Sequence, residues 1–381
     1  MKVVHVNESY WPVVGGLERA VQSIAEELVK LGHEVHVVTS WFGADNRSRE
    51  EVINGVYVHR VQSLRLHYPD LTYPLEYPDS ILRDSDVVHG HSQNSLFIVK
   101  MVGRAERLGV KAVMHFMAVD AFRDHPNFFI RFIAPYYGRR NTKKALKIAN
   151  LLLVRSIRDL EILRREYGVD AEYLPDAVPE YFFTMEKEDS DEFRKKFGIR
   201  QEKFFLFIGR MHRLKGPHIL VKALKYVGED VAAVLIGPDG GYLKETLDLA
   251  EGLGVRDRVY ALGYVDEETK IRVLDSAIAL VLPSMADHVE VYSIVISEAW
   301  AREKPIIASM VGEIPYRVKQ DVNGLLVDPS DPKALAEAML KVANDEELAE
   351  EMGRNGRKNV FSWREIAARS IQLYGQVLEN R

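Results

Sequence analysis

Short apolar runs alternate along the chain with longer segments in which apolar residues recur every three or four positions. The first run, VVHV at residues 3–6, leads into a loop that ends in two glycines. Apolar residues then recur at helical spacing from Leu17 to Leu31, and a second run, EVHVVT, begins at Glu34. A strand, a helix and a strand in this order predict parallel pairing through a right-handed crossover.

The same alternation continues almost to the end of the chain. Further strands are predicted at residues 86–91, 111–116, 151–156, 204–209, 231–237, 258–263, 278–284 and 305–309. Asn54-Gly55 predicts a hairpin turn, and the charged run at 186–193 predicts a connector into a short helix. The strands form two groups, so the pattern predicts two doubly wound α/β domains with a boundary near residues 178–190.

Composition narrows the class of protein. A length of 381 residues is enough for two or three domains, and a charged fraction of 28% is that of a soluble globular protein. The net charge of -5 gives no sign of nucleic-acid binding, so an anionic ligand requires local positive charge. The absence of cysteine excludes disulfides and thiolate metal sites. The N-terminal segment lacks the apolar core of a signal peptide, and we therefore expect a cytoplasmic protein.

The loop FIGRMHRLKG, at residues 207–216, follows a predicted strand and carries two cations. In doubly wound sheets, ligands bind at the carboxyl ends of the strands. Gly209 ends the strand, and Arg210 and Lys215 follow it. A planar guanidinium and a mobile ammonium together suit a phosphate group. A solvated basic loop is the alternative interpretation.

Gly15-Gly16 lies directly before the first predicted helix. The free N–H groups and the dipole at a helix N-terminus bind anions. The segment is not GxGxxG, so it carries no nicotinamide fingerprint. An ordinary turn is the alternative interpretation.

The stretch EVYSIVISEAWA contains two acids, Glu290 and Glu298, around mostly apolar residues. Ser293 is expected to cap a helix that starts at Ile294. Glu290 then lies in the loop before this helix, and Glu298 lies within it. We expect the two carboxylates to hold different parts of one ligand, since carboxylates accept sugar hydroxyls and a helix N-terminus suits phosphate. The alternative is one surface glutamate and one glutamate on a helix face.

Three histidines, His89, His91 and His115, stand at predicted strand ends. The sequence HGH invites a metal interpretation, because histidine is a frequent metal ligand. No third ligand follows at metal-site spacing, so we expect no metal and interpret these side chains as hydrogen-bonded or substrate-contacting. His115 closes an apolar run and is expected to face a ligand cleft.

These features occur together in one order along the chain. The series is GG before a helix, a strand ending in histidine, GR-x4-KG, PS followed by E-x7-E, PIIA, G-x-I-P and NGLLV. Over nearly the full chain it resembles the retaining glycosyltransferases of glycosyltransferase family 4, the group that includes glycogen-synthase-like and mannosyltransferase-like enzymes. The resemblance implies an α/β GT-B fold, with two Rossmann-like doubly wound domains facing each other across a cleft.

The resemblance also implies a division of labour along the chain. Residues 1–180 are expected to form the acceptor-side domain, and residues 181–362 the domain that binds the nucleotide sugar. Residues 363–381 are expected to form a C-terminal helix that returns to the N-terminal domain.

The implied reaction moves a hexose from a nucleoside-diphosphate sugar to a hydroxyl of an acceptor, without a metal ion and with retention of configuration. The implied catalytic residues are His115, Arg210, Lys215 and Glu290. The implied donor-binding residues are Gly15, Gly16, Gly209, Ser293, Ile294 and Glu298. The family's pattern gives no protein nucleophile, and the leaving phosphate takes the acceptor's proton.

The roles follow from the matching positions. Gly16 resembles the glycine whose backbone lies near the donor diphosphate, and Arg210 and Lys215 resemble the pair that binds it. Glu290 resembles the acid that holds the sugar hydroxyls, and Glu298 the acid that holds the ribose. His115 resembles the histidine that touches the transferring sugar.

Three positions depart from the family's pattern. Ser293 stands where glycine is usual, Asp176-Ala177 where asparagine-glycine is usual, and Tyr316 where an acid is frequent. These departures bear on which donor is bound and leave the expected fold unchanged. We favour a UDP-hexose over a GDP- or ADP-hexose, and expect a glycan, sugar phosphate or lipid-linked acceptor. A GT-B nucleotide-sugar epimerase and a non-catalytic nucleotide-sugar-binding protein are the alternatives.

Residues 131–147 contain six cations and no acid, beside Tyr136 and Tyr137. In an acidic chain, this local charge suggests contact with an anionic membrane surface or with an acceptor that carries phosphate. A solvated helix face is the alternative interpretation.

Overall fold

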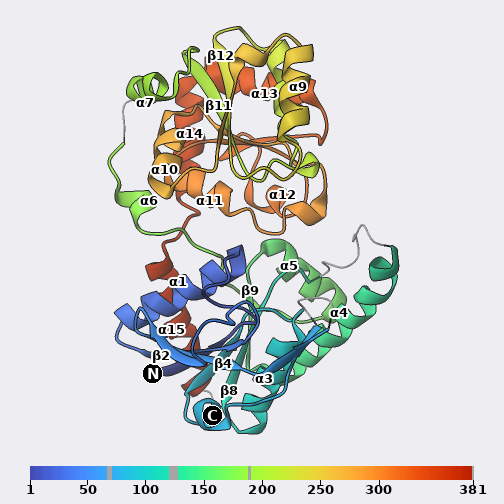
Figure 1. The fold of residues 1–381 in the computed structure, drawn as a ribbon, viewed down its shortest axis with the longest axis vertical. Helices are drawn as coiled ribbons and strands as arrows, with labels where there is room; N and C mark the ends of the chain where they lie inside the picture. Colours follow the sequence, from blue (N-terminus) through green and yellow to red (C-terminus); the bar gives the residue numbers. More distant parts are fainter. Residues whose placement is uncertain (67–70, 120–127, 188–189, 380–381) are drawn as a thin grey trace. The chain divides into compact units, whose positions relative to one another are not determined.

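The chain forms two compact units in the computed structural model, which describes residues 1–66, 71–119, 128–187 and 190–379 (Figure 1). The first unit comprises Met1–Ala177 together with Phe361–Arg381, and the second comprises Val178–Val360. Each unit is a largely parallel sheet with helices on both faces, as expected for a doubly wound α/β fold. Within the described residues, no helix is both long and apolar enough to cross a membrane.

In its described residues, the first unit contains an eight-stranded sheet in the order β10-β9-β8-β7-β1-β2-β4-β3. Its strands are β1 (Lys2–Val6), β2 (Glu34–Ser40), β3 (Glu50–Ile53), β4 (Val56–Val61), β7 (Val87–Gly90), β8 (Lys111–Phe116), β9 (Leu151–Val154) and β10 (Glu172–Tyr173). Only β3 runs antiparallel to its neighbour, through the hairpin expected at Asn54-Gly55. A separate small hairpin, β5 (Ser63–Arg65) and β6 (Thr72–Pro74), was not predicted from the sequence.

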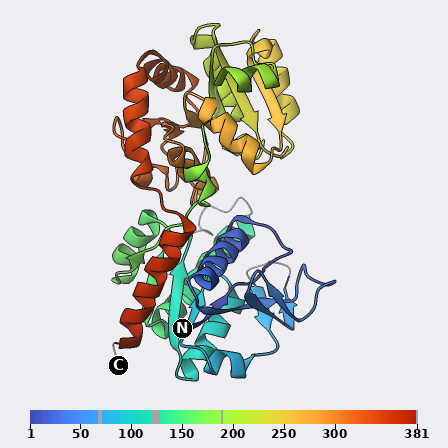
Figure 2. The ribbon, with the colours of Figure 1, turned by 90° about the vertical axis from the view of Figure 1, so that its left-hand side faces the viewer.

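Helices cover both faces of this sheet because successive strand residues point to opposite sides. The helices are α1 (Gly16–Lys30), α2 (Asp79–Arg83), α3 (Leu96–Arg107), α4 (Phe128–Ile148), α5 (Ile157–Ile162), a π-helical turn (Leu163–Tyr167) and α15 (Trp363–Glu379). Val3 and Val87 pack in the layer formed with α1 and α15, whereas Val4 and Val88 pack toward α3. The C-terminal helix α15 lies beside α1 and completes this unit (Figure 2).

In its described residues, the second unit contains a six-stranded parallel sheet in the order β13-β12-β11-β14-β15-β16. Its strands are β11 (Lys203–Ile208), β12 (Val231–Ile236), β13 (Val259–Gly263), β14 (Leu280–Leu282), β15 (Ile306–Ser309) and β16 (Gly324–Val327). This is the strand order of a dinucleotide-binding Rossmann sheet, and it reverses between β11 and β14. The five strands that the sequence predicts in this half are present.

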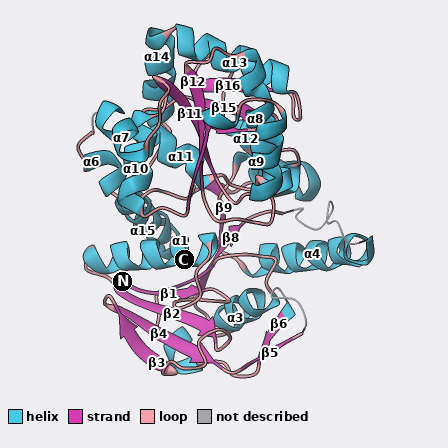
Figure 3. Ribbon diagram, turned by 45° about the horizontal axis from the view of Figure 1, so that its top comes forward, coloured by secondary structure: helices cyan, strands magenta, loops and turns pink. Residues whose placement is uncertain are grey.

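The helices of the second unit form two layers (Figure 3). They are α6 (Tyr181–Thr184), α7 (Ser190–Phe197), α8 (Pro217–Ala223), α9 (Leu243–Gly252), α10 (Glu267–Ser276), α11 (Ile294–Ala301), α12 (Ile314–Arg317), α13 (Pro332–Asn344) and α14 (Glu346–Arg357), with single 3₁₀ turns at Arg213–Lys215, Leu224–Tyr226, Arg256–Arg258 and Asp287–Val289. Phe205 and Phe207 of β11 face α8 and α13, and Phe204 and Leu206 face α10 and α11. Of the charged run at 186–193, residues 188 and 189 lie outside the described residues.

A buried ion pair joins α10 to the end of α11. The Arg302 guanidinium donates through Nε and Nη2 to the two carboxylate oxygens of Asp275, at 2.7 and 2.8 Å, and through Nη1 to the Phe182 carbonyl. The two side chains are 3% and 1% exposed. A buried carboxylate that loses its partner is costly, so this pair fixes how the two helices sit against each other.

We expect Arg302→Met to lower the free energy of unfolding by about 3–5 kcal/mol, because it leaves the Asp275 carboxylate buried without its partner. Arg272→Met is the matched control, since Arg272 pairs with Glu268 on the exposed side of α10. Loss of that exposed pair should cost about 0.5 kcal/mol or less. Urea unfolding of both variants measures the difference. Equal losses would contradict a special role for the buried pair.

Candidate active site

The loops that follow β11 and β14 meet where the strand order of the second sheet reverses. Gly209 and Arg210 follow β11 directly, and Pro283-Ser284 follow β14. The backbone N–H of Met285 donates to the Leu214 carbonyl at 2.8 Å, which joins the two loops. Ligands bind at this point in doubly wound sheets, so the expected cationic loop lies at the favoured position of the fold.

Glycine is required where these loops touch. Gly216 has φ +74°, and a Cβ there would lie 1.9 Å from the Pro283 carbonyl oxygen. Gly237, after the neighbouring strand β12, has φ +133°, and a Cβ there would lie 2.1 Å from the Gly209 carbonyl oxygen. Any other residue would force the loops apart, because both the conformation and the space exclude a side chain.

Lys215, Ser284 and Glu290 form a hydrogen-bonded group at this junction. The Lys215 ammonium donates to Glu290 Oε1 at 2.8 Å, and the Ser284 hydroxyl donates to the same oxygen at 2.6 Å. Lys215 also donates to the Val289 carbonyl at 2.9 Å. Glu290 is 1% exposed, so it is not the surface glutamate of the alternative interpretation. An anionic group and a hydroxyl of a ligand would therefore meet one connected charge pair.

Arg210 differs from Lys215 in having an exposed guanidinium. In the described parts of the chain, no residue forms a hydrogen bond or ion pair with it. Its aliphatic stem lies against Gly240, where a Cβ would be 2.7 Å from Arg210 Cγ. The guanidinium is thus held at its base and is open at its tip to an anion.

Glu298 is buried in α11 and pairs with a lysine that the sequence analysis did not single out. Lys270 of α10 donates to Glu298 Oε1 at 2.7 Å and lies 2.9 Å from Glu267. Burial alone would lower the pKa of Lys270, but Glu298 and Glu267 outweigh burial and raise the pKa. Lys270 therefore stays charged, and a ribose that binds Glu298 would share the carboxylate with this ammonium.

The G-x-I-P segment supports the loop that carries Glu290. The Glu313 N–H donates to the Glu290 carbonyl at 2.9 Å, and the Gly312 N–H donates to Asp287 Oδ1 at 2.8 Å. Gly312 has φ +58°, and a Cβ there would lie 2.3 Å from the Glu290 carbonyl oxygen. Tyr316, where family members often have an acid, is half-buried in α12.

The start of α11 corrects one expectation. Ser293 occupies the N-cap position and Ile294 begins the helix, but the Ser293 side chain makes no capping hydrogen bond. Arg317 donates instead to the Ser293 carbonyl at 2.8 Å and to the Ser297 hydroxyl at 2.6 Å, and its guanidinium lies 4.5 Å from the centre of the Tyr292 ring. No local pattern marks Arg317, because its partners lie about 20 residues away.

In the first unit, the two expected glycines open α1. Gly15 is the N-cap with an extended backbone, and Gly16 is the first helical residue. A Cβ on Gly16 would meet no atom within 4 Å, so the space above this backbone is open. A Cβ on Gly15 would instead lie 2.3 Å from Glu18 Oε2, so the Glu18 carboxylate lies against the Gly15 backbone.

The three expected histidines lie in the first unit and are all buried, with a fourth, His5, that the sequence analysis missed. His115, expected to face a cleft, is 4% exposed, and its Nε2 donates to the Leu174 carbonyl at 2.9 Å. Burial lowers the pKa of His5 to about 3 and depresses the pKa values of the other three. All four rings are therefore neutral at pH 7.

Asp176, part of the departure from the family's asparagine-glycine pattern, forms a partly buried ion pair with Arg155 at 2.8 Å. Ala177, which follows it, is 2% exposed. The aspartate at this position thus neutralises a guanidinium at the end of the first sheet.

Comparisons with known proteins identify the family of this chain. The model "Glycosyltransferase Family 4" matches residues 14–178, and the model "Glycosyl transferases group 1" matches residues 189–359. The protein is a glycosyltransferase of the GT-B fold. It belongs to glycosyltransferase family 4, as its ordered motifs predict.

Several curated relatives cover most of the chain. An uncharacterized glycosyltransferase of Methanocaldococcus jannaschii is 28% identical over 100% of this chain and 99% of its own length. The N-acetyl-alpha-D-glucosaminyl L-malate synthase of Bacillus anthracis is 25% identical over 97% of this chain and 96% of its own length. A D-inositol 3-phosphate glycosyltransferase of Xylanimonas cellulosilytica is 31% identical over 64% of this chain and 61% of its own.

Solved structures confirm the fold. The sucrose-phosphate synthase of Thermosynechococcus elongatus has a TM-score of 0.73 at 22% identity, covering 100% of both chains. Anabaena HepE in complex with UDP has a TM-score of 0.76 at 17% identity, covering 99% of this chain and 100% of that one. The predicted class, two Rossmann-like domains of the GT-B type, is therefore correct.

We expect Gly216→Ala to destabilise the second unit by several kcal/mol, because the methyl group meets the Pro283 carbonyl in a left-handed backbone. Gly241→Ala is the matched control: Gly241 has φ +83°, and a Cβ there meets no atom within 4 Å. Gly241→Ala should lower the free energy of unfolding by only about 1–2 kcal/mol, the cost of placing a non-glycine residue in a left-handed backbone conformation. Thermal unfolding of both variants gives the comparison. A Gly216→Ala variant no less stable than Gly241→Ala would show that the two loops are not in contact.

Proposed function

We propose that this glycosyltransferase moves a hexose from a nucleoside-diphosphate sugar to an acceptor hydroxyl and retains the anomeric configuration. The observation that carries the proposal is the group at the β11–β14 junction, where Lys215 and Ser284 both donate to the buried Glu290 and the Arg210 guanidinium is open. The cations suit the diphosphate on one side of the bond that breaks, and the carboxylate suits the hydroxyls of the hexose on the other side. In this proposal residues 181–362 bind the donor, and residues 1–180 serve the acceptor side.

The leaving group sets the electrostatic requirement. When the bond between the anomeric carbon and the phosphate oxygen breaks, the nucleoside diphosphate gains negative charge. Arg210, Lys215 and the N–H groups at the start of α11 can stabilise this charge, and each well-placed donor contributes about two to three orders of magnitude in rate. Gly209 allows the backbone to approach the phosphates. We therefore propose that no metal ion is needed at the diphosphate.

The two acids divide the donor between them. Glu290, fixed by Lys215 and Ser284, accepts hydrogen bonds from the hexose hydroxyls. Glu298, fixed by Lys270, accepts hydrogen bonds from the ribose, close to Ser293 and Ile294 at the start of α11. His115 is proposed as a sugar contact from the family resemblance alone, since its Nδ1 is buried in this structure.

No side chain is proposed as a nucleophile. The departing phosphate oxygen takes the proton of the acceptor hydroxyl as the new glycosidic bond forms on the same face of the sugar. An α-linked donor then gives an α-linked product. The transferase names of the relatives favour this reaction over the epimerase and binding-protein alternatives.

The donor nucleotide is proposed to be UDP. Structures of Anabaena HepE, which shares the fold, were obtained with UDP and with UDP-glucose. The relatives include a D-inositol 3-phosphate glycosyltransferase and an N-acetyl-alpha-D-glucosaminyl L-malate synthase. We therefore propose to screen small hydroxylated anions as acceptors, together with glycans and lipid-linked sugars.

We expect UDP to raise the melting temperature more than GDP or ADP, without added Mg²⁺, because a ligand of the folded state stabilises it by mass action. Arg210→Ala should weaken UDP binding by about 10–100-fold, the value of one or two charge-assisted hydrogen bonds. Arg213→Ala, an exposed cation on the same loop, is the control and should bind UDP normally.

Incubation of UDP-hexoses with an acceptor panel, followed by NMR of the anomeric proton, tests the reaction itself. An α-linked product from an α-linked donor is the expected result. A β-linked product would contradict retention. Equal stabilisation by all nucleotides, or equal loss in both arginine variants, would overturn the proposed donor site.

We also propose that α4 touches an anionic membrane surface. Phe132, Ile133 and Tyr136 are 80%, 66% and 75% exposed, and cations follow them on the same helix. Burial, Arg140 and Lys100 lower the pKa of Lys144, as expected where positive charges crowd together. Exposed apolar side chains beside cations are typical of helices that lie in the membrane interface. Arg131, at the start of the basic stretch, lies outside the described side chains.

We expect the protein to sediment with vesicles that contain phosphatidylglycerol at low salt and to dissociate as salt is raised, since the attraction is screened. Phe132→Ser with Ile133→Ser should reduce binding, whereas Tyr264→Ser, an exposed aromatic residue of the second unit, should not. No binding to either kind of vesicle would show that α4 is a solvated face, and equal binding to neutral and anionic vesicles would refute the preference for an anionic surface.

A further inference from the structure

Four histidines and a tyrosine from distant parts of the sequence meet on one face of the first sheet. His5 in β1 lies opposite His89 in β7 in the strand register, at the point where the order of this sheet reverses. His91 follows β7, and its ring stacks on that of His89 with centroids 4.1 Å apart. The His115 ring lies 5.5 Å from His89. Val3 and Val87 lie two residues before His5 and His89 on the same strands, and these valines pack under α1 and α15.

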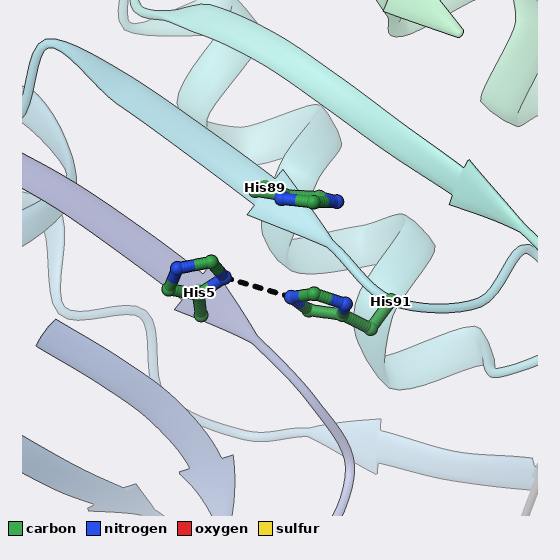
Figure 4. A group of neighbouring side chains, drawn as sticks. All are labelled: His5, His89 and His91. Carbon is green, nitrogen blue, oxygen red and sulfur yellow. Dashed lines mark hydrogen bonds between the residues drawn. The ribbon is translucent and has the colours of Figure 1, made fainter. Parts of the chain in front are cut away.

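The ring nitrogens of this cluster are poorly satisfied by the protein. His5 Nδ1 and His91 Nε2 are 2.7 Å apart, and His89 Nδ1 is 2.6 Å from the Tyr374 hydroxyl of α15 (Figure 4). The remaining nitrogens, His5 Nε2, His89 Nε2 and His91 Nδ1, are buried without a partner among the described residues. Each buried group left without a hydrogen bond costs about 1–3 kcal/mol. His5 Nε2 and His91 Nδ1 lie on the outer sides of the two rings in Figure 4, so a ligand shared by the cluster would use the nitrogens that face one another.

The arrangement limits what that ligand is. His5, His89 and His91 are at most 1% exposed, and each can offer one nitrogen so that the three lie within 4.8 Å of one another. Three nitrogens bound to one tetrahedral ion at about 2.0–2.1 Å lie about 3.3 Å apart, so the rings must rearrange for all three to coordinate. Neutral imidazole is the form that binds metals.

We propose that His5, His89 and His91 bind a divalent transition-metal ion, of which Zn²⁺ is the type, with a water in the fourth position. Imidazole ligands suit zinc and its neighbours, whereas Mg²⁺ and Ca²⁺ prefer oxygen. If His89 donates its Nδ1 proton to the Tyr374 oxygen, its Nε2 lone pair is free for the metal, which is the usual outer-shell support of a histidine ligand. The contact between His5 and His91 gives way to coordination by both rings.

The ion would act as a cross-link in the first unit. It would join the carboxyl ends of β1 and β7 and, through His89 and Tyr374, the C-terminal helix α15. This metal is separate from the transfer chemistry, which needs no metal at the donor diphosphate. Metal binding is measured without a nucleotide, so failure of the metal proposal can be distinguished from failure of the proposed donor site.

Cobalt titration tests the site on protein without a polyhistidine tag, stripped by a chelator under mild denaturation and refolded. We expect visible ligand-field absorption typical of tetrahedral Co²⁺ that saturates at one ion per chain and disappears when Zn²⁺ is added. Zn²⁺ should also raise the melting temperature of the stripped protein by several degrees.

His5→Gln and His91→Gln should each lose the cobalt absorption. His59→Gln should keep it, since His59 belongs to a separate histidine pair with His36, 2.9 Å apart, that is less buried. Circular dichroism checks that the variants fold. If a variant does not fold, the titration of the wild-type protein still decides the question.

Absence of saturable absorption in the wild-type protein, together with no thermal shift by Zn²⁺, would overturn the proposal and leave an ordered water as the partner of these nitrogens. Absorption that persists in both His5→Gln and His91→Gln would also overturn it, by placing the cobalt elsewhere.

Discussion

The contact between the loops after β11 and β14 is the constraint on which the donor site depends. Gly216 lies so close to the Pro283 carbonyl that no side chain fits between them. This contact brings Lys215 from one loop to Ser284 and Glu290 from the other, and it buries the carboxylate. A carboxylate buried to this extent needs charged and hydrogen-bonding partners, so the packing and the electrostatics of the site require each other.

Further cations stabilise the helices that pack next to this junction. Arg302 fixes α10 against α11 through Asp275, and Arg317 fixes the start of α11 through the Ser293 carbonyl. Lys270 in turn meets Glu298 across the same pair of helices. Glu298 is thus oriented by a lysine, and the helix that carries it by two arginines, that do not themselves belong to the proposed contacts with the sugar or the phosphates.

The two sheets use the same topological position for different chemistry. In the second sheet the reversal of strand order carries glycines and charged side chains on loops. In the first sheet it carries buried, neutral histidines within the strands themselves, at His5 and His89. Loops leave room for a mobile ligand, whereas strand residues beneath α1 and α15 are enclosed. That difference is why we propose a substrate site in one unit and a structural ion in the other.

The sequence by itself determined the two doubly wound units, most strands of their parallel sheets, the helix start at Gly15-Gly16 and the family, because periodicity, glycine conformation and motif order are local properties. The β5–β6 hairpin and β16 were not predicted. The expected positions of Arg210 and Lys215 at a strand end follow from the same local signals. Only the tertiary structure decided which groups meet: that Glu290 is buried against Lys215, that Lys270 and Arg317 support α11, and that His5 completes a cluster with His89 and His91. These contacts join residues from 20 to 86 positions apart, and the spacing of residues along a chain does not encode which strand ends and helix faces will lie side by side.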